Sequence, residues 1–351
     1  MFSIGIVGLP NVGKSTLFQA LTKKQVDIAN YPFCTVEPNK GIIEVPDLKL
    51  DKLTEISKSQ RKVPTAIEFV DIAGLVRGAN KGEGLGNQFL AQIREVNLIV
   101  EVVRNFSKKD IIHVNGQINP KDDIEIINLE LIMKDLETVE KHLAKIRKES
   151  RSQNTNSEEL VLLEKIVEWL KNEKLIYDLV ISIETQSKKK IIKKILQDLH
   201  LLTAKPIIYL LNNDIGQEVE NFPYNPIINL DVKLELETIG LSSAERQELG
   251  APPSKLDSLI RLCYDTLNQI TFYTTGEDET RAWTVKRGAT ADVAAGKIHS
   301  DFQKKFICAE VIDYQTLIDC GQWKKAKENG LVRTEGKNYL VKDGDIMIFK
   351  I

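Results

Sequence analysis

The chain has 351 residues, 42% of them hydrophobic, and its 48 lysines and arginines nearly balance 50 aspartates and glutamates. This length predicts two or three domains, and a net charge of −2 excludes binding to nucleic acid through overall charge alone. Without a run of about 18 apolar residues we expect no membrane-spanning helix, and four cysteines with no CxxC pair indicate reduced thiols in a cytoplasmic protein.

Short apolar runs alternate with helical or glycine-rich stretches in the first part of the chain and again after residue 200. The expected strands are residues 2–7, 41–45, 66–70, 98–103, 206–211 and 226–230. Strands that alternate with helices predict an α/β fold with a mostly parallel sheet covered on both faces. We therefore expect residues 1–125 and 201–274 to form one nucleotide-binding domain.

The first expected strand runs directly into a glycine-rich turn and then a helix. The turn, Gly8-Leu-Pro-Asn-Val-Gly13-Lys14-Ser15-Thr16, fits the phosphate-binding pattern G-x-x-x-x-G-K-[ST] in the context that the pattern needs. Its glycines let backbone N–H groups surround phosphates, and the start of the helix adds its positive dipole end. Lys14 is expected to contact the β and γ oxygens, and the Ser15 hydroxyl to reach Mg²⁺.

Three further residues are candidates for the same site. Asp71 follows an apolar strand, where an acid can hold Mg²⁺ through water. The backbone N–H of Gly74 is placed to approach the γ-phosphate, and five glycines between residues 74 and 86 predict a loop that orders and disorders with nucleotide. Thr35 is a candidate Mg²⁺ ligand in the loop after the first helix, although most loop threonines only bond locally.

The element that reads the base is expected after the strand at 206–211, at Asn212-Asn213-Asp214-Ile215. A guanine-specific site has the pattern N-K-x-D, whose acid accepts from guanine N1 and N2. Here Ile215 takes the place of that acid, and the neighbouring Asp214 is shifted by one residue. We therefore expect weak guanine selectivity, with Asn212 offering its amide to the purine or simply capping the strand end.

Residues 126–200 break the alternation of strands and helices. Apolar residues step by three and four at Leu129, Ile132, Leu136, Val139, Leu143 and Ile146, and again at Leu160, Leu163, Val167 and Leu170. This spacing predicts an antiparallel coiled-coil arm with a polar tip at residues 151–157. Basic side chains on the arm, such as Lys141 and Arg147, are candidates to meet RNA phosphates; the alternative is a solvated helix face with interleaved acids.

Residues 275–351 predict a small α+β module of the β-grasp type. We expect a strand at 280–286, a helix that Thr290 caps and that runs to His299, and a final hairpin. The hairpin is predicted from the Asp343-Gly344 turn between the apolar runs 338–341 and 346–350.

Several stretches together resemble the YchF/Obg-like ATPase family: GLPNVGKST, NYPFCT, DIAGLVRGANKGEGLGNQFL and DIIHVNGQINPKDDIEIINLEL. The later stretch TRAWTVKRGATADVAAGKIHSDFQKKFICAEVI is similar to the TGS-type domain of that family. The resemblance covers essentially the whole chain. It implies a P-loop GTPase-like domain, a coiled-coil arm and a TGS-type domain, hydrolysis of ATP in preference to GTP, and association with ribosomes.

The resemblance also implies roles for individual residues. The phosphate loop is matched by Asn11, Val12, Gly13, Lys14, Ser15 and Thr16, the Mg²⁺ ligands by Ser15 and Thr35, and the Walker-B acid by Asp71. Leu75 stands where Ras-like enzymes carry a catalytic glutamine, so intrinsic hydrolysis is expected to be slow. Ile215 replaces the family's glutamate in the base motif, so the expected preference for ATP rests on the family resemblance alone.

Two residues carry hypotheses with an open alternative. His113 is the candidate to position the attacking water, because Leu75 cannot hydrogen-bond and because the Ile-Ile-His-Val segment recurs in the family pattern; the alternative is a loop histidine bonded to nearby backbone. Asn11 is the candidate ligand for K⁺ beside the phosphates, and the alternative is a turn-forming asparagine.

We therefore expect a ribosome-associated ATPase, with GTP as a further substrate candidate, that switches with nucleotide in translation or stress response. Water would attack the γ-phosphorus in line, with Mg²⁺ bridging the β and γ oxygens. Two alternatives stay open: a GTPase that acts in ribosome assembly, and a nucleotide-gated adaptor whose turnover is incidental.

Overall fold

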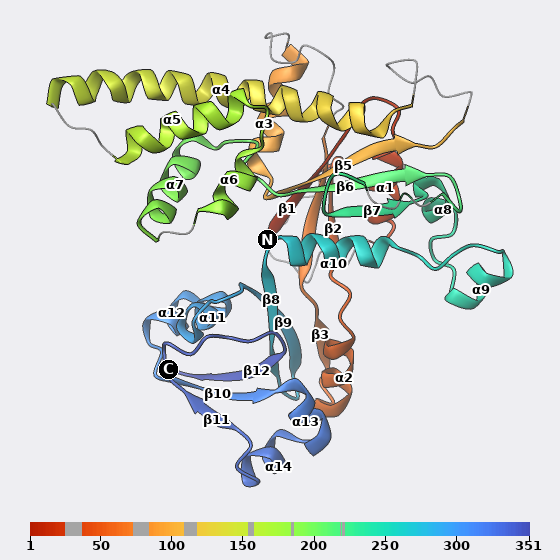
Figure 1. The fold of residues 1–351 in the computed structure, drawn as a ribbon. Helices are drawn as coiled ribbons and strands as arrows, with labels where there is room; N and C mark the ends of the chain where they lie inside the picture. Colours follow the sequence, from red (N-terminus) through yellow and green to blue (C-terminus); the bar gives the residue numbers. More distant parts are fainter. Residues whose placement is uncertain are drawn as a thin grey trace.

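Two six-stranded sheets form the centres of two bodies, and a helical arm projects from the first (Figure 1). This arrangement comes from a computed structural model. The structure describes residues 1–24, 37–72, 84–108, 118–153, 158–183, 186–217, 219 and 222–351.

The first sheet contains all six strands expected from the apolar runs. In spatial order they are β2 (Lys40–Glu44), β4 (Ala66–Asp71), β1 (Phe2–Val7), β5 (Leu98–Asn105), β6 (Ile207–Asn213) and β7 (Ile227–Leu230). Every neighbouring pair is parallel except β2 and β4, which are antiparallel. The expected mostly parallel sheet is confirmed, and its central strands are almost wholly buried because helices cover both faces.

Helices of the first body pack on this sheet and form one core with it. They are α1 (Lys14–Thr22), α3 (Gly84–Glu95), α8 (Val232–Glu237) and α10 (Leu256–Thr266). A further short helix, α9 (Ser243–Glu248), is joined to α8 by the ion pair of Arg246 with Glu235. The parallel strands all end at the edge where α1 begins. That edge is where ligands bind in open α/β sheets.

The arm begins within a single long helix, α4 (Pro120–Gln153), and returns along α5 (Glu158–Lys171). Ile124 and Leu131 of α4 belong to the core of the sheet, whereas Val139 and Leu143 pack in a second core with α5. The coiled-coil hairpin is thus confirmed, and its expected tip lies partly outside the described residues. The arm has two more helices that share its core, α6 (Ile176–Ser182) and α7 (Gln186–Leu199).

A buried carboxylate joins the arm to the sheet. Asp135 on α4 accepts hydrogen bonds from the backbone N–H groups of Leu202 and Thr203, at 2.9 and 2.7 Å, and from the Thr203 hydroxyl. These bonds fix the chain just before β6, so they set where the arm leaves the first body.

The second body is an α+β module, as predicted. Its sheet runs in the order β11 (Arg333–Glu335), β10 (Cys308–Asp313), β12 (Asp345–Lys350), β8 (Gln269–Thr275), β9 (Glu279–Lys286) and β3 (Arg61–Val63). Its helices are α2 (Leu48–Ser57), α11 (Ala291–Ile298), α12 (Ser300–Lys304), α13 (Tyr314–Cys320) and α14 (Trp323–Glu328).

The predicted C-terminal hairpin is wrong. Residues 338–341 make only an isolated bridge, between Leu340 and Thr290, and β12 pairs instead with β10 and β8. The Asp343-Gly344 turn is present, but Asp343 is engaged elsewhere: its carboxylate accepts from the N–H of Thr271 on β8. The Asp-Gly turn predicts pairing between neighbouring segments only, whereas β12 pairs with strands that are distant in the sequence.

Two expected domain limits also differ from the observed packing. Residues 48–63 were expected in the nucleotide-binding domain, but Leu50 and Leu53 of α2 bury against Tyr273, and β3 pairs with β9. Residue 275 was the expected start of the second body, but it ends β8, which pairs with β9 along its whole length. The second sheet therefore begins at Gln269 and takes in an N-terminal segment.

In the part of the chain that the structure describes, no helix combines the length and the apolar character needed to cross a membrane.

Candidate functional site

The phosphate loop lies between β1 and α1, and its two glycines are required by close contacts. A Cβ on Gly8 would overlap the carbonyl oxygen of Val102 on β5. Gly13 has a φ of 107°, and a Cβ there would lie 2.5 Å from Nδ2 of Asn212. Only glycine fits both positions, so the loop curls tightly against the ends of β5 and β6.

Lys14, the first residue of α1, is buried and points back into this loop. Its Nζ donates to the carbonyl oxygen of Leu9 at 2.8 Å. Burial lowers the pKa of Lys14 to about 8, and the nearby Asp71 carboxylate opposes that shift. An ammonium group that is already desolvated is well placed to bind a phosphate oxygen, because little hydration is left to remove.

Ser15 and Asp71 meet across the loop, as a Mg²⁺ site requires. The Ser15 hydroxyl donates to Oδ2 of Asp71 at 3.1 Å, and Asp71 ends β4 beside β1. Burial raises the pKa of Asp71, while the bond from Ser15 and the charge of Lys14 lower it.

These donors fit Mg²⁺ by their chemistry. A hydroxyl and a carboxylate oxygen are hard ligands, and Mg²⁺ in triphosphate sites takes its remaining ligands from phosphates and water. No group of three or more His, Cys, Asp or Glu side chains able to hold a metal occurs among the described residues.

Asn212 connects the phosphate loop to the far side of the site. Its Nδ2 donates to the carbonyl oxygen of Val12 at 2.9 Å, and its Oδ1 accepts from the N–H of Val232 at 3.1 Å. Its side chain is 6% exposed. The expected strand-end asparagine is therefore a structural bridge, and both ends of its amide are already used by the protein.

A pocket of about 740 Å³ opens beside this bridge. Asn11, Gly13 and Thr16 line its phosphate end. Its other end is lined by Asp231, Val232 and Lys233, the stretch that the family resemblance matches to a base-supporting loop. It is also lined by residues that the sequence argument did not single out: Phe106, Lys108, Leu234 and Glu237. Their position in the sequence could have identified them, because they follow the ends of β5 and β7 at the same edge of the sheet as the start of α1.

The base-reading stretch departs from a guanine site in the manner expected. Ile215 lines the pocket, is 62% exposed and offers no hydrogen-bond acceptor from its side chain. Asp214 is engaged elsewhere: its Oδ2 accepts from the N–H and the hydroxyl of Ser107, both at 2.9 Å. The backbone bond from Ser107 lowers the pKa of Asp214, so this carboxylate is ionised and committed to the loop after β5.

Asn213 is equally unable to act as the lysine of a guanine motif. It accepts from Nδ2 of Asn105 at 2.8 Å and donates to Oδ1 of Asn229 at 2.7 Å. This ladder of amides ties three strands together beneath the base end of the pocket.

Some expected site residues lie outside the described residues: Thr35, Gly74, Leu75 and His113. Their predicted roles stay predictions. The described phosphate-loop residues, Asp71 and Asn212 do come together at one edge of the sheet.

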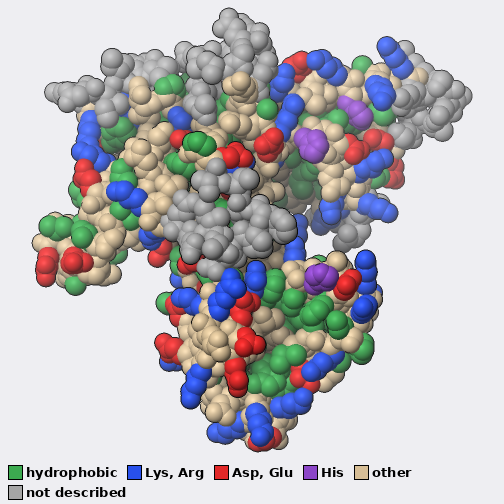
Figure 2. Space-filling view, turned by 180° about the vertical axis from the view of Figure 1, so that it is seen from behind, with side chains coloured by type: hydrophobic (Ala, Val, Ile, Leu, Met, Phe, Trp, Pro, Cys, Tyr) green, Lys and Arg blue, Asp and Glu red, His purple; other side chains and the backbone are tan. Residues whose placement is uncertain are grey.

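Two of the arm's candidate basic side chains are paired with acids. Lys141 contacts Glu137 at 2.5 Å and Arg147 contacts Glu164 at 2.7 Å. Basic and acidic side chains are interspersed over the face of the molecule shown in Figure 2. Contact between the arm and RNA phosphates stays a prediction, beside the alternative of a solvated helix face.

A tight glycine loop between strand and helix, a lysine aimed into it, and a serine–aspartate pair across it define a P-loop nucleoside-triphosphatase. Residues 3–153 match the family model described as 50S ribosome-binding GTPase, and residues 269–351 match YchF-GTPase_C, described as a protein of unknown function (DUF933). The second match begins where β8 begins.

Full-length relatives identify the family. The chain is 46% identical to the "Ribosome-binding ATPase YchF" of Bacillus subtilis and to that of Escherichia coli O157:H7, covering 99% of this chain and 98% of each relative. It is also similar to a solved structure of the Schizosaccharomyces pombe YchF GTPase, with a TM-score of 0.85 and 37% identity over 99% of this chain and 97% of that one. The chain belongs to the YchF family.

Proposed function

We propose that this chain hydrolyses ATP at the site between α1, β4 and β6, and that it acts as a nucleotide-dependent switch on the ribosome. The observation that carries the choice of base is the pocket at Ile215. Ile215 stands at the position of the acid that would accept from guanine N1 and N2, and the neighbouring Asp214 is bonded to Ser107. The pocket's other two acids are also engaged: Asp231 accepts from the N–H of Leu234, and Glu237 pairs with Lys233 at 3.3 Å. The relatives named as ribosome-binding ATPases support the same substrate and partner.

Lys14 and the start of α1 would hold the triphosphate, through the ammonium group and the backbone N–H groups. Ser15, Asp71 and Thr35 would hold Mg²⁺. When bound, Mg²⁺ supplies positive charge that offsets the charge on the phosphate oxygens. The bond from Ser15 to Asp71 keeps both oxygens at the phosphate side of the loop before the metal arrives.

Three further assignments in this proposal rest on single residues. His113 would position the attacking water in place of the missing glutamine, and Gly74 would donate its N–H to the γ-phosphate. Asn11 would add a K⁺ ligand, because it lies at the phosphate end of the pocket in a left-handed conformation with φ of 64°. Equal turnover in K⁺ and in Na⁺ would remove the K⁺ site, and normal stimulated hydrolysis by His113→Ala would remove the histidine.

A nucleotide-gated adaptor with slow turnover is the second candidate, favoured by Leu75 at the position of the Ras-like glutamine. A GTPase in ribosome assembly is less consistent with Ile215. In either case we place the protein in the cytoplasm, where ATP and ribosomes meet. We also assign the nucleotide-binding body to residues 1–47, 64–125 and 201–268, the arm to 126–200, and the second body to 48–63 and 269–351.

The test measures ATP turnover and ribosome co-sedimentation with ATP, ADP and no nucleotide, for the wild-type chain and Lys14→Ala. We expect the wild-type chain to hydrolyse ATP and to bind ribosomes in a nucleotide-dependent way, and Lys14→Ala to lose both responses. Ribosome binding that ignores nucleotide would contradict the switch. Nucleotide-dependent binding without ribosome-stimulated turnover would favour the adaptor.

A further inference from the structure

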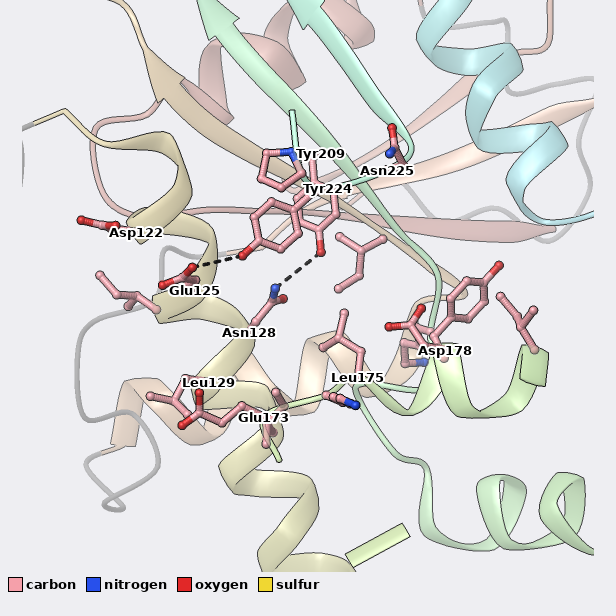
Figure 3. Close-up of a pocket in the computed structure, with 18 residues that line it drawn as sticks. Asp122, Glu125, Asn128, Leu129, Glu173, Leu175, Asp178, Tyr209, Tyr224 and Asn225 are labelled. Carbon is pink, nitrogen blue, oxygen red and sulfur yellow. Dashed lines mark hydrogen bonds between the residues drawn. The ribbon is translucent and has the colours of Figure 1, made fainter. Parts of the chain in front are cut away.

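Figure 3 shows a second pocket, of about 780 Å³. It is formed by α4, α6, the first half of β6 and the segment before β7. The nucleotide pocket is at the opposite ends of the same strands, and the two pockets share no lining residue. The second pocket is therefore a separate place on the molecule.

The interior of this pocket is aromatic and presents an unused acceptor. The rings of Tyr209 and Tyr224 lie 5.1 Å apart, and Nδ2 of Asn128 donates to the Tyr209 hydroxyl at 3.5 Å. Oδ1 of Asn128 is buried and has no hydrogen-bond partner in the described part of the chain, and the residue is 8% exposed. A buried carbonyl oxygen without a partner costs about 1–3 kcal/mol, so this site favours a ligand that brings an N–H donor.

The rim of the pocket is acidic. One of its four acids, Glu125, is engaged: it lies 3.9 Å from Lys121 and accepts from the Tyr224 hydroxyl at 3.5 Å. Asp122, Glu173 and Asp178 are exposed there, and none of the described residues forms an ion pair with them. The two lysines of the rim are turned to other partners. Lys174 lies over the Trp169 ring at 4.8 Å.

The other lysine, Lys205, also leaves the acids without a counter-charge. Its Nζ donates to the carbonyl oxygens of Arg94 and Val96, outside the pocket. The pocket thus offers negative charge and hydrogen-bond acceptors to an incoming group.

The occupant must carry positive charge, N–H donors and apolar surface. Leu129 on α4 and Ile181 on α6 line the pocket with 42% and 65% of their surface exposed. An apolar flank of this kind is not covered by a simple polyamine, and RNA is repelled by the acids. A protein segment with alternating basic and apolar side chains satisfies the rim, the flank and Asn128 together.

We propose that this pocket docks an arginine- or lysine-bearing segment of a partner protein. The long side chain of an arginine would pass over the tyrosine rings and bring its guanidinium to Oδ1 of Asn128. Further basic side chains of the segment would meet Asp122 and Asp178, which lie on opposite sides of the pocket (Figure 3). Apolar side chains of the segment would cover Leu129 and Ile181. The inference does not depend on which nucleotide the chain hydrolyses.

The probe is a capped peptide of alternating arginine and leucine, titrated calorimetrically into the full chain. The pocket variant is Asp122→Lys with Asp178→Lys. Its matched control is Glu168→Lys with Asp198→Lys, which changes the net charge equally at exposed positions of α5 and α7 outside the pocket. We expect the pocket variant to weaken binding at least about tenfold, about 1.4 kcal/mol, and the control to stay within about twofold.

Further variants separate the parts of the proposal. Asn128→Leu removes the acceptor and should weaken the arginine peptide, whereas Ile181→Ser should weaken the peptide but not spermine. ATP affinity should be unchanged in all these variants, which distinguishes this site from the nucleotide site.

Three outcomes would overturn the proposal: no binding of the peptide by the wild-type chain at about 1 mM, equal weakening by the pocket and control variants, or tighter binding of single-stranded RNA than of the peptide at this pocket. Spermine that binds as tightly as the peptide, with the same response to every variant, would assign the pocket to polyamines instead.

Discussion

Asn212→Asp changes one atom of the bridge between the phosphate loop and α8. The Val232 N–H keeps its acceptor, but the Val12 carbonyl oxygen loses its donor and faces a carboxylate oxygen at the distance of the former bond, 2.9 Å. A buried carbonyl without a partner costs about 1–3 kcal/mol. We expect the free energy of unfolding to fall by at least that amount.

Because the lost bond holds the phosphate loop itself, nucleotide affinity should fall as well. If the same 1–3 kcal/mol appears in binding, ATP affinity drops by between about fivefold and about 150-fold. The assays are urea denaturation and titration with a fluorescent ATP analogue in Mg²⁺.

The control is Tyr264→Phe, whose hydroxyl bonds to Thr271 and Thr284 far from the phosphate loop. This variant should lose stability but keep its ATP affinity. If Asn212→Asp lost stability to a similar extent and yet bound ATP like the wild-type chain, the bridge would have no part in shaping the phosphate loop.

Further predictions concern the base, a buried acid and the contact between the two bodies. Ile215→Asp should shift the ratio of GTP to ATP affinity toward GTP by about tenfold in a competition assay, because it restores an acceptor in the pocket; an unchanged ratio would contradict this. Burial raises the pKa of Glu101 well above its ordinary value, and the charge of Asp123 raises it further. Between the pKa of Glu101 in the unfolded chain and its higher pKa in the folded chain, only the folded chain keeps the proton. The free energy of unfolding therefore falls as pH rises through that range. Glu101→Gln should therefore remove this pH dependence. In urea denaturation across pH, its free energy of unfolding should rise most, relative to wild type, at the alkaline end; pH profiles that run parallel for the variant and the wild type would refute this. Tyr273→Phe removes a 2.8 Å bond to Asp47, the N-cap of α2, and should cost about 1 kcal/mol of unfolding free energy, with no loss of ATP affinity.

The sequence predicts the first body well because its signals are local. Each strand is a continuous apolar run, and the phosphate loop is a fixed pattern between a strand and a helix. Lys14, Ser15 and Asp71 could be named because a short motif and a strand end carry their chemistry.

The rest depends on contacts that no local pattern encodes. The donor of Asn212 reaches a carbonyl 200 residues away, and β3 pairs with a strand more than 200 residues later. Residues 338–341 have the composition of a strand, but they do not pair with β12, because β10 and β8 occupy both of its edges. Long-range pairing of this kind is decided by the packing of the whole second body.

Affinity for ATP against GTP tests the central claim most directly. Isothermal titration of the nucleotide-free chain with ATP and with GTP, in Mg²⁺ and K⁺, compares the two bases at the pocket that contains Ile215. We predict that ATP binds at least as tightly as GTP and that Lys14→Ala binds neither tightly. Tenfold tighter binding of GTP, a difference of about 1.4 kcal/mol, would contradict the assignment as an ATPase.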